Sequence, residues 1–258
     1  MVSSKKSALL TPDSSLLAAQ KEMVHPRHAS TVVLVRPNDN GAFEVLLTRR
    51  PAEMRFLGGF YVFPGGTVHQ DDYSPRTLAR CRGLSGAEAR QILGGVHESN
   101  VALGHWVAVV RELFEEVGIL LCVTESGDDV DMPGGAAAKR FETNRRSIVN
   151  RQLDFGAFLK LVNLYCDISR AIYFDHWVTP EIYSMRFDTR FYIAMLPANQ
   201  SPLARSEEVT HSLWIKPEDA MARIHRQDFP ILPPTTTVLQ NLARLGSWDR
   251  LRAEFKLS

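Results

Sequence analysis

The chain has 258 residues, of which 45% are hydrophobic and 23% are charged, as expected for an ordinary globular protein with a sizeable core. Lys and Arg number 30 and Asp and Glu number 29, which leaves a net charge of +1. This balance excludes a general electrostatic attraction to nucleic acid or to an anionic membrane, so affinity for a charged ligand must come from a local cluster.

Three cysteines, Cys81, Cys122 and Cys166, lie far apart in the sequence. Their odd number and wide spacing argue against a disulfide framework or a zinc site of paired cysteines, and favour a reducing compartment. No apolar run approaches the roughly 18 residues of a membrane-spanning helix. The first residues lack a continuous apolar secretory core, and the ending "FKLS" differs from the peroxisomal Ser-Lys-Leu signal. We therefore expect a cytoplasmic protein without a membrane or nucleic-acid partner.

The first elements in chain order are β-strands. Residues 1–28 are interpreted as a flexible N-terminal extension, and residues 29–258 are predicted to form a single domain. The runs 29–36 and 43–49 flank the turn signal "NDNG", which predicts a β-hairpin. Another short strand is predicted at 60–63, where "PGG" ends it.

Helices and strands mix in the rest of the chain. A helix is predicted at 106–117, with Gly118 as its C-cap and a strand at 119–123 behind it. Further helices are predicted at 136–149, at 155–163 behind Asp154 as N-cap, at 217–225 and at 235–245. Further strands are predicted at 170–178, 187–196 and 209–215. The mixture indicates the α/β fold class.

Two stretches are interpreted as insertions on this scaffold. The first covers about residues 73–105 and contains a short helix that Ser85 starts and Gly94 ends. The second, at about 124–168, is partly helical and opens with an exposed acidic loop at 124–135. Neither stretch looks like a separate domain.

The helix at 106–117 carries three glutamates and no lysine near them. At about 100° per residue, Glu112, Glu115 and Glu116 fall within a narrow arc opposite the apolar residues of the helix, and we expect that arc to face outward. Converging carboxylates suit Mg²⁺ or Mn²⁺. The alternative interpretation is an acidic face that is simply solvated.

The same helix resembles a motif of the Nudix hydrolases. Residues 111–119, "RELFEEVGI", match its second half, Arg-Glu-apolar-x-Glu-Glu-x-Gly-apolar, at every specified position. The first half, Gly, five residues and Glu, resembles Gly66, "TVHQD" and Asp72, with aspartate in place of glutamate. About 31 residues more than in the family pattern separate the two halves. The intervening chain must therefore loop away and return if the halves form one site.

This resemblance implies a Nudix-type α/β/α sandwich with a mixed sheet and helical insertions. Its implied catalytic set is Glu112, Glu115, Glu116 and Arg111. The glutamates would be ligands of Mg²⁺ or Mn²⁺, and the arginine is expected to form ion pairs rather than to do chemistry. Gly65 and Gly66 would shape a substrate-binding loop beside the helix, and Asp72 is an additional candidate.

Residues 46–66, "LLTRRPAEMRFLGGFYVFPGG", resemble the coenzyme A signature of one group of Nudix enzymes. Only Pro51 departs from it, where the family has serine or alanine. The resemblance implies that Arg50 and Arg55 bind the coenzyme, because guanidinium groups bind phosphate with two hydrogen bonds. The long interruption of the Nudix motif is also similar to that of a branch that includes peroxisomal coenzyme A diphosphatases.

Two further groups of residues bear on the site: the acidic residues of a late loop and the histidines. The stretch "RSEEV" is similar to a late acidic loop of the family, so Glu207 or Glu208 is a candidate for a further metal ligand or base. Five of the eight histidines show no metal-ligand spacing with one another, so we expect them to be structural, with His69 in the glycine loop as an exception. They are His69, His97, His105, His176 and His211.

The expected function is metal-dependent hydrolysis of a diphosphate, with coenzyme A or acyl-coenzyme A as substrate and 3′,5′-ADP and a 4′-phosphopantetheine as products. One alternative is a Nudix hydrolase that acts on ADP-ribose or NADH. Another is a catalytically silent Nudix-fold protein with a binding or regulatory role, favoured if the insertion buries the acidic face. The sequence leaves open whether the chain forms a homodimer.

Overall fold

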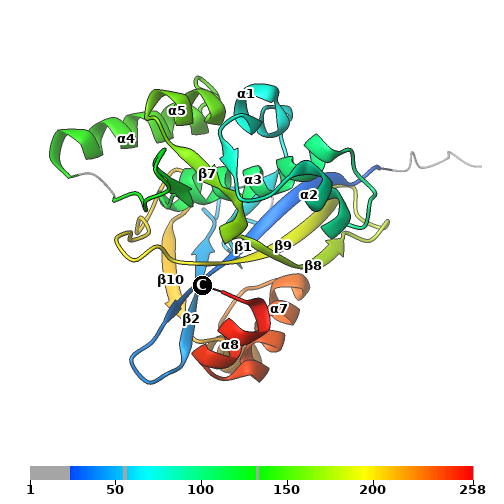
Figure 1. Cartoon of the computed structure of the whole chain (residues 1–258). Coiled ribbons are helices and arrows are strands. Elements are labelled where there is room, and N and C mark those ends of the chain that lie inside the picture. The colour runs from blue at the N-terminus through cyan, green and yellow to red at the C-terminus, as the bar shows by residue number, and fades with distance from the viewer. Residues whose placement is uncertain (1–23, 55–56, 132–133, 258) are drawn as a thin grey trace, which may run out of the picture.

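The computed structural model describes residues 24–54, 57–131 and 134–257 (Figure 1). Most of the predicted N-terminal extension lies outside the described residues, and so does Arg55. Strand β1 (Arg27–Pro37) begins inside the predicted extension, because Arg27 already pairs with Phe187 of β9. The boundary predicted at residue 28 is therefore slightly too late.

A mixed β-sheet forms the centre of the molecule. Within the described residues it has seven strands in the order β10-β2-β1-β9-β8, with β3 beside β2 and β4 beside β1. The strands after β1 are β2 (Phe43–Arg49), β3 (Tyr61–Val62), β4 (Gly65–Thr67), β8 (Ile172–Val178), β9 (Phe187–Met195) and β10 (His211–Ile215). Strand β1 runs parallel to β9 and antiparallel to β2, so the predicted hairpin and the predicted mixed sheet are confirmed.

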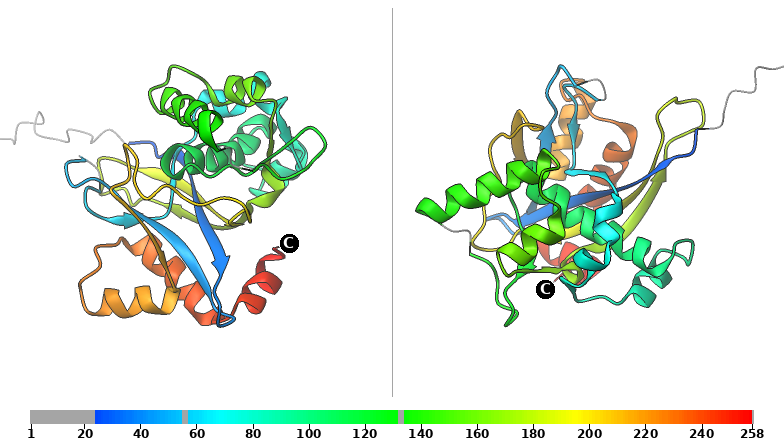
Figure 2. Two further views of the ribbon diagram at one scale, coloured as in Figure 1. Left: turned by 90° about the vertical axis from the view of Figure 1, so that its left-hand side faces the viewer. Right: turned by 90° about the horizontal axis from the view of Figure 1, so that it is seen from above.

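Helices cover both faces of the sheet (Figures 1 and 2). Helix α3 (Ser99–Val117) packs on one face over one hydrophobic core. The helices α6 (Pro217–His225), α7 (Pro233–Leu245) and α8 (Trp248–Phe255) cover the other face over a second core. The predicted α/β/α sandwich is confirmed, and α8 is a helix that the sequence interpretation missed.

Helix α3 begins at Ser99, seven residues before the predicted start at 106. Glycine is a poor helix former, so Gly104 weakened the helical pattern of this stretch. The structure uses that glycine for close packing, since a Cβ there would lie 2.9 Å from Cδ1 of Tyr73. The helix ends as predicted at Gly118, which is left-handed with φ 73°. None of the helices in the described ranges, α3 included, is long and apolar enough to cross a membrane.

The two predicted insertions fold over α3, on the side away from the sheet (Figure 2). The first holds α1 (Pro75–Leu78) and α2 (Gly86–Ile92), just after the 3₁₀ turn η2 (Gln70–Tyr73). The second holds α4 (Gly135–Val149), α5 (Phe155–Leu161) and the 3₁₀ turn η3 (Ile168–Arg170). Ser85 and Asp154 cap α2 and α5 with their side chains, as predicted.

The glutamates of α3 are largely covered. Glu112 is only 6% exposed and Glu116 only 3%. The helical pattern correctly placed the three glutamates together, but it carried no information about strand β4, which packs against them. Helix α3 lies between the two insertions and the sheet.

A second, three-stranded sheet contains all three cysteines. It consists of β5 (Cys81–Arg82), β7 (Tyr165–Asp167) and β6 (Cys122–Val123), in that order. Cys166 is the pairing partner of both Cys81 and Cys122, and all three thiols are free. Distance in the sequence was therefore a poor guide to their distance in space. The strand predicted at 119–123 shrinks to β6 and belongs to this small sheet.

Candidate active site

The glycine strand β4 touches the glutamates of α3. A Cβ at Gly66 would lie 2.3 Å from Oε1 and 2.7 Å from Oε2 of Glu112, closer than any real contact. The backbone N–H of Gly65 points at Oε1 of Glu116 over a long 3.5 Å. Glycine at position 66 is thus required by close approach to a carboxylate, with no need for an unusual backbone conformation.

Arg111 joins the two separated halves of the motif. Its Nε and Nη2 donate to the two carboxylate oxygens of Asp72 at 2.7 and 3.0 Å. Its Nη1 donates to Glu112 at 2.7 Å and to Glu115 at 3.2 Å, and Nη2 also donates to the carbonyl of Thr67 at 2.8 Å. The prediction that the chain between Asp72 and Arg111 loops away and returns is confirmed by these contacts.

A hydrogen bond from the backbone also fixes the position of Asp72. It is fully buried, and its Oδ2 accepts a hydrogen bond of 2.8 Å from the backbone N–H of His69 at the start of η2. Aspartate is shorter than the glutamate of the family pattern, and here the 3₁₀ turn carries its carboxylate to the guanidinium. The substitution therefore leaves the contact with Arg111 intact.

Burial and mutual repulsion disfavour the charged forms of Glu115 and Glu116. Burial raises the pKa of Glu115 to about 7, against the opposing charge of Arg111. Burial also raises the pKa of Glu116 well above its ordinary value, and the charges of Glu112 and Glu208 add to this effect. Oε2 of Glu116 is buried without a hydrogen-bond partner within the described part of the chain. The cluster therefore has an excess of acceptor oxygens over donors.

An open cleft of about 950 Å³ lies beside this cluster. Its lining includes Arg50 just after β2, both glycines of β4 and four carboxylates of the candidate set, those of Asp72, Glu112, Glu115 and Glu208. Residues of β1, β9, α4, α5 and α7 also form part of the wall. A volume of this size is at the upper end of the range for small-molecule sites. Glu116 is not among the lining residues and lies behind the surface.

The two acidic residues of the late loop, Glu207 and Glu208, lie in different surroundings. Glu208 lines the cleft, and burial followed by the charge of Glu112 raises its pKa. Glu207 instead pairs with Arg145 of α4 at 2.8 Å and with Arg146 at 3.3 Å. Of the two candidates, only Glu208 faces the space where a ligand would lie.

Sequence reasoning missed Arg145. This arginine is 2% exposed, and its Nη1 donates to the backbone carbonyl of Glu115 at 2.5 Å while Nη2 reaches Glu207. It thereby ties the second insertion to the glutamate helix and to the late loop. The local signal was only a Glu142–Arg145 pair three residues apart, which is common on helix surfaces.

Changing Gly66 to alanine is expected to lower the catalytic rate constant kcat about 100-fold. The reason is that the new methyl group displaces the carboxylate of Glu112 by about 1 Å. The overall fold should persist, since the clash is with the end of a side chain. The measurement is steady-state kinetics with circular dichroism and thermal melting. Gly134→Ala is the matched control, because a Cβ there meets nothing within 4 Å. Wild-type turnover in folded Gly66→Ala would show that Glu112 need not hold its position.

Fold and site together define a class of protein: a glutamate-bearing helix and a glycine strand on a mixed sheet within an α/β/α sandwich. Residues 87–245, more than half of the chain, match the family model described as NUDT19 Nudix domain. The chain therefore belongs to the Nudix family, in the group that this model describes.

Relatives and solved structures agree with this placement. The chain is 28% identical to the "Acyl-coenzyme A diphosphatase NUDT19" of Gallus gallus, over 88% of this chain and 70% of that protein. It is 25% identical to the "Putative nudix hydrolase 7" of Caenorhabditis elegans, over 86% of this chain and 62% of that protein. The chain thus spans less than two thirds of the length of some curated relatives that it matches. A crystal structure of a Nudix hydrolase from Alicyclobacillus acidocaldarius superposes with a TM-score of 0.75 at 26% identity, covering 92% of this chain and 99% of that one.

Proposed function

We propose that the protein is a metal-dependent diphosphatase that acts on coenzyme A or an acyl-coenzyme A. The observation that carries the proposal is one cleft in which carboxylates and arginines face each other. Glu112, Glu115 and Glu208 are among its carboxylates, and Arg50 adds a positive charge to those of Arg111 and Arg151. Such a lining suits a phosphate-bearing ligand together with a divalent cation.

The donor set fits Mg²⁺ or Mn²⁺. Carboxylate oxygens are the preferred ligands of these hard cations, and Oε2 of Glu116 is a buried acceptor that receives no hydrogen bond from the described residues. We propose that Glu112, Glu115 and Glu116 hold the cation. When bound, it supplies a Lewis acid for the diphosphate and lowers the pKa of a water molecule.

The chain's own residues have distinct tasks in this proposal. Arg50 binds a phosphate group, and the bare backbone of Gly65 and Gly66 leaves room for it beside the helix. Arg111 fixes the rotamers of Glu112 and Glu115 through its hydrogen bonds. Glu208 accepts the proton of the attacking water at a carboxylate oxygen, a role for which a raised pKa is suitable.

The substrate assignment rests on two further observations. The coenzyme A signature at 46–66 ends at the cleft, where Arg50, Gly65 and Gly66 lie together. The relatives from Gallus gallus and Homo sapiens carry the name acyl-coenzyme A diphosphatase. The second alternative, a silent binding protein, is disfavoured because Glu112 and Glu115 line the open cleft despite the insertion above α3.

One panel assay tests the proposal. Coenzyme A, an acyl-coenzyme A, ADP-ribose and NADH are each incubated with the protein and Mg²⁺ or Mn²⁺, and the products are separated by chromatography. We expect 3′,5′-ADP and a 4′-phosphopantetheine from the coenzyme A substrates, with kcat/KM at least about 10-fold higher than for the other two, which corresponds to 1.4 kcal/mol of preference. Glu112→Gln under the same conditions controls for contaminating hydrolases.

Equal kcat/KM on all four compounds would reject the coenzyme A assignment and leave a broad diphosphatase. Preference for ADP-ribose or NADH would favour the first alternative. Absence of turnover on every compound, together with measurable binding of one of them, would favour the silent binding protein.

A further inference from the structure

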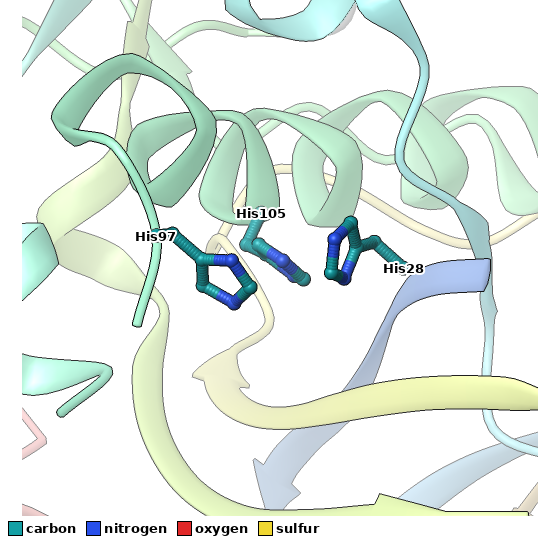
Figure 3. A group of neighbouring side chains, drawn as sticks. All are labelled: His28, His97 and His105. Atoms are coloured by element: carbon teal, nitrogen blue, oxygen red, sulfur yellow. The ribbon is translucent and has the colours of Figure 1, made fainter. Parts of the chain in front are cut away.

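Three histidines from separate elements lie close together where α3 packs on strand β1 (Figure 3). His28 lies on β1, His97 on the connection between α2 and α3, and His105 on α3. The ring centroids are 4.8 Å apart for His28 and His97, 5.5 Å for His28 and His105, and 5.1 Å for His97 and His105. Figure 3 shows the three rings close to one another.

The histidine cluster is separate from the cleft. Successive side chains of a strand point to opposite faces, and Ala29 and Thr31 of β1 line the cleft. His28 and Ser30 therefore lie on the face that α3 covers. None of the three histidines is among the residues that line the cleft.

The buried member of the cluster can offer a lone pair to a ligand in one of its two neutral forms. His105 is 0% exposed, and its Nδ1 lies 3.0 Å from Oγ of Ser30. When Nδ1–H donates to that hydroxyl, Nε2 is left with a lone pair, and Nε2 has no hydrogen-bond partner within the described residues. Burial lowers the pKa of His105 to about 3, so the ring is neutral at pH 7.

From this geometry we infer that His28, His97 and His105 form a binding site for one divalent first-row transition cation, for which Zn²⁺ is the natural probe. One ligand atom from each histidine lies within 4.8 Å of the others. Imidazole nitrogens suit Zn²⁺ and its neighbours, whereas Mg²⁺ prefers oxygen. Zinc ligands at 2.0–2.1 Å stand about 3.4 Å apart, so the rings close slightly on the cation.

Charged residues next to the histidines both favour and oppose the binding of a cation. His28 lies 3.7 Å from Asp188, whose carboxylate also pairs with His176 at 2.5 Å. Arg190 donates to Nε2 of His97 at 3.2 Å and pairs with the same aspartate. Asp188 therefore offsets the positive charge of Arg190, and a cation would take over the lone pair of His97 that the guanidinium now uses.

A cation bound at the three histidines would link separate parts of the fold. The bound cation would join the interrupted segment of the Nudix motif, through His97 and His105, to the central strand β1, through His28. This site is chemically distinct from the carboxylate cluster, so the two sites can be loaded independently.

The test uses the full chain after removal of metals with a chelator. The protein is dialysed against Zn²⁺ in the presence of saturating Mg²⁺, which occupies the carboxylate site, and the bound zinc is measured by elemental analysis. We expect one Zn²⁺ per chain. His28→Gln and His97→Gln should each weaken zinc binding by more than about 10-fold, since even residues behind the ligands contribute that much. Both residues are at least partly exposed, so these variants should fold.

Two controls locate the site. His211→Gln removes an exposed histidine of β10 and should bind zinc like the wild type, and so should Glu112→Gln. Co²⁺ should give visible absorption typical of nitrogen ligation in the wild type and lose it in His97→Gln. The inference is overturned by failure of the wild type to retain zinc, by unchanged zinc binding in both histidine variants, or by loss of zinc in Glu112→Gln.

Discussion

Glu116→Gln is expected to lower kcat on the order of 1,000-fold, within the range for a positioned carboxylate, and to raise the melting temperature of the metal-free protein. The loss of turnover follows from the proposed role of Glu116 as a cation ligand. The gain in stability follows from its burial, because the side chain is 3% exposed and one of its oxygens has no partner among the described residues.

The size of the gain in stability depends on pH. The pKa of Glu116 in the folded protein is raised well above its ordinary value of 4.5. Between these two values the unfolded chain has lost the proton and the folded chain keeps it, so stability falls as pH rises. Glutamine does not ionise, and the advantage of the variant should therefore be small below pH 4.5 and grow as the pH rises above it.

Thermal melting from pH 4 upward in the presence of a chelator measures this effect. Glu254→Gln is the matched control, because it removes the same charge from an exposed position of α8. Saturating Mg²⁺ should stabilise the wild type more than the variant and reduce the difference. Unchanged kcat, or a lower melting temperature of Glu116→Gln in chelator at pH 7, would contradict this account.

Arg111→Met is expected to cost about 3–5 kcal/mol of folding free energy, because it leaves Asp72, Glu112 and Glu115 buried without their counter-charge. The corresponding drop in melting temperature is about 10 °C. Turnover should be lost as well, since the rotamers of Glu112 and Glu115 depend on the same guanidinium.

A double-mutant cycle with Asp72→Asn sharpens this test. Because the asparagine carries no charge, the double variant should be less destabilised than the sum of the single variants, by about 0.5–3 kcal/mol. Arg76→Met is the control for an ordinary ion pair, since Arg76 is 65% exposed in its pair with Asp154 and should contribute about 1 kcal/mol or less. Additive effects in the cycle would show that Arg111 and Asp72 do not depend on each other.

The local parts of the site were predictable from sequence. Helical periodicity placed Glu112, Glu115 and Glu116 on one arc, and the glycine pattern pointed to Gly66 beside them. Both inferences depend on residues close together in the chain. The fold class was predictable for the same reason, because each strand and helix carries its own pattern.

The parts that escaped prediction depend on contacts between distant segments. Arg145 reaches Glu115 across 30 positions of sequence, and Ser30 reaches His105 across 75. Spacing along the chain could not reveal such pairs, nor that His97 and His105 lie beside His28 in the fold. The homodimer is untested by a single chain and stays a prediction.

The contact between Asp72 and Arg111 also explains how the motif tolerates its interruption. The entropy lost on closing a flexible loop grows only with the logarithm of its length, so lengthening the interval about fivefold costs only about 1.5 kcal/mol. The buried ion pair closes that loop with two hydrogen bonds to one carboxylate, and Arg111 adds a third to the carbonyl of Thr67. The fold can therefore vary this segment's length at small thermodynamic cost, provided that the two residues at its ends still meet.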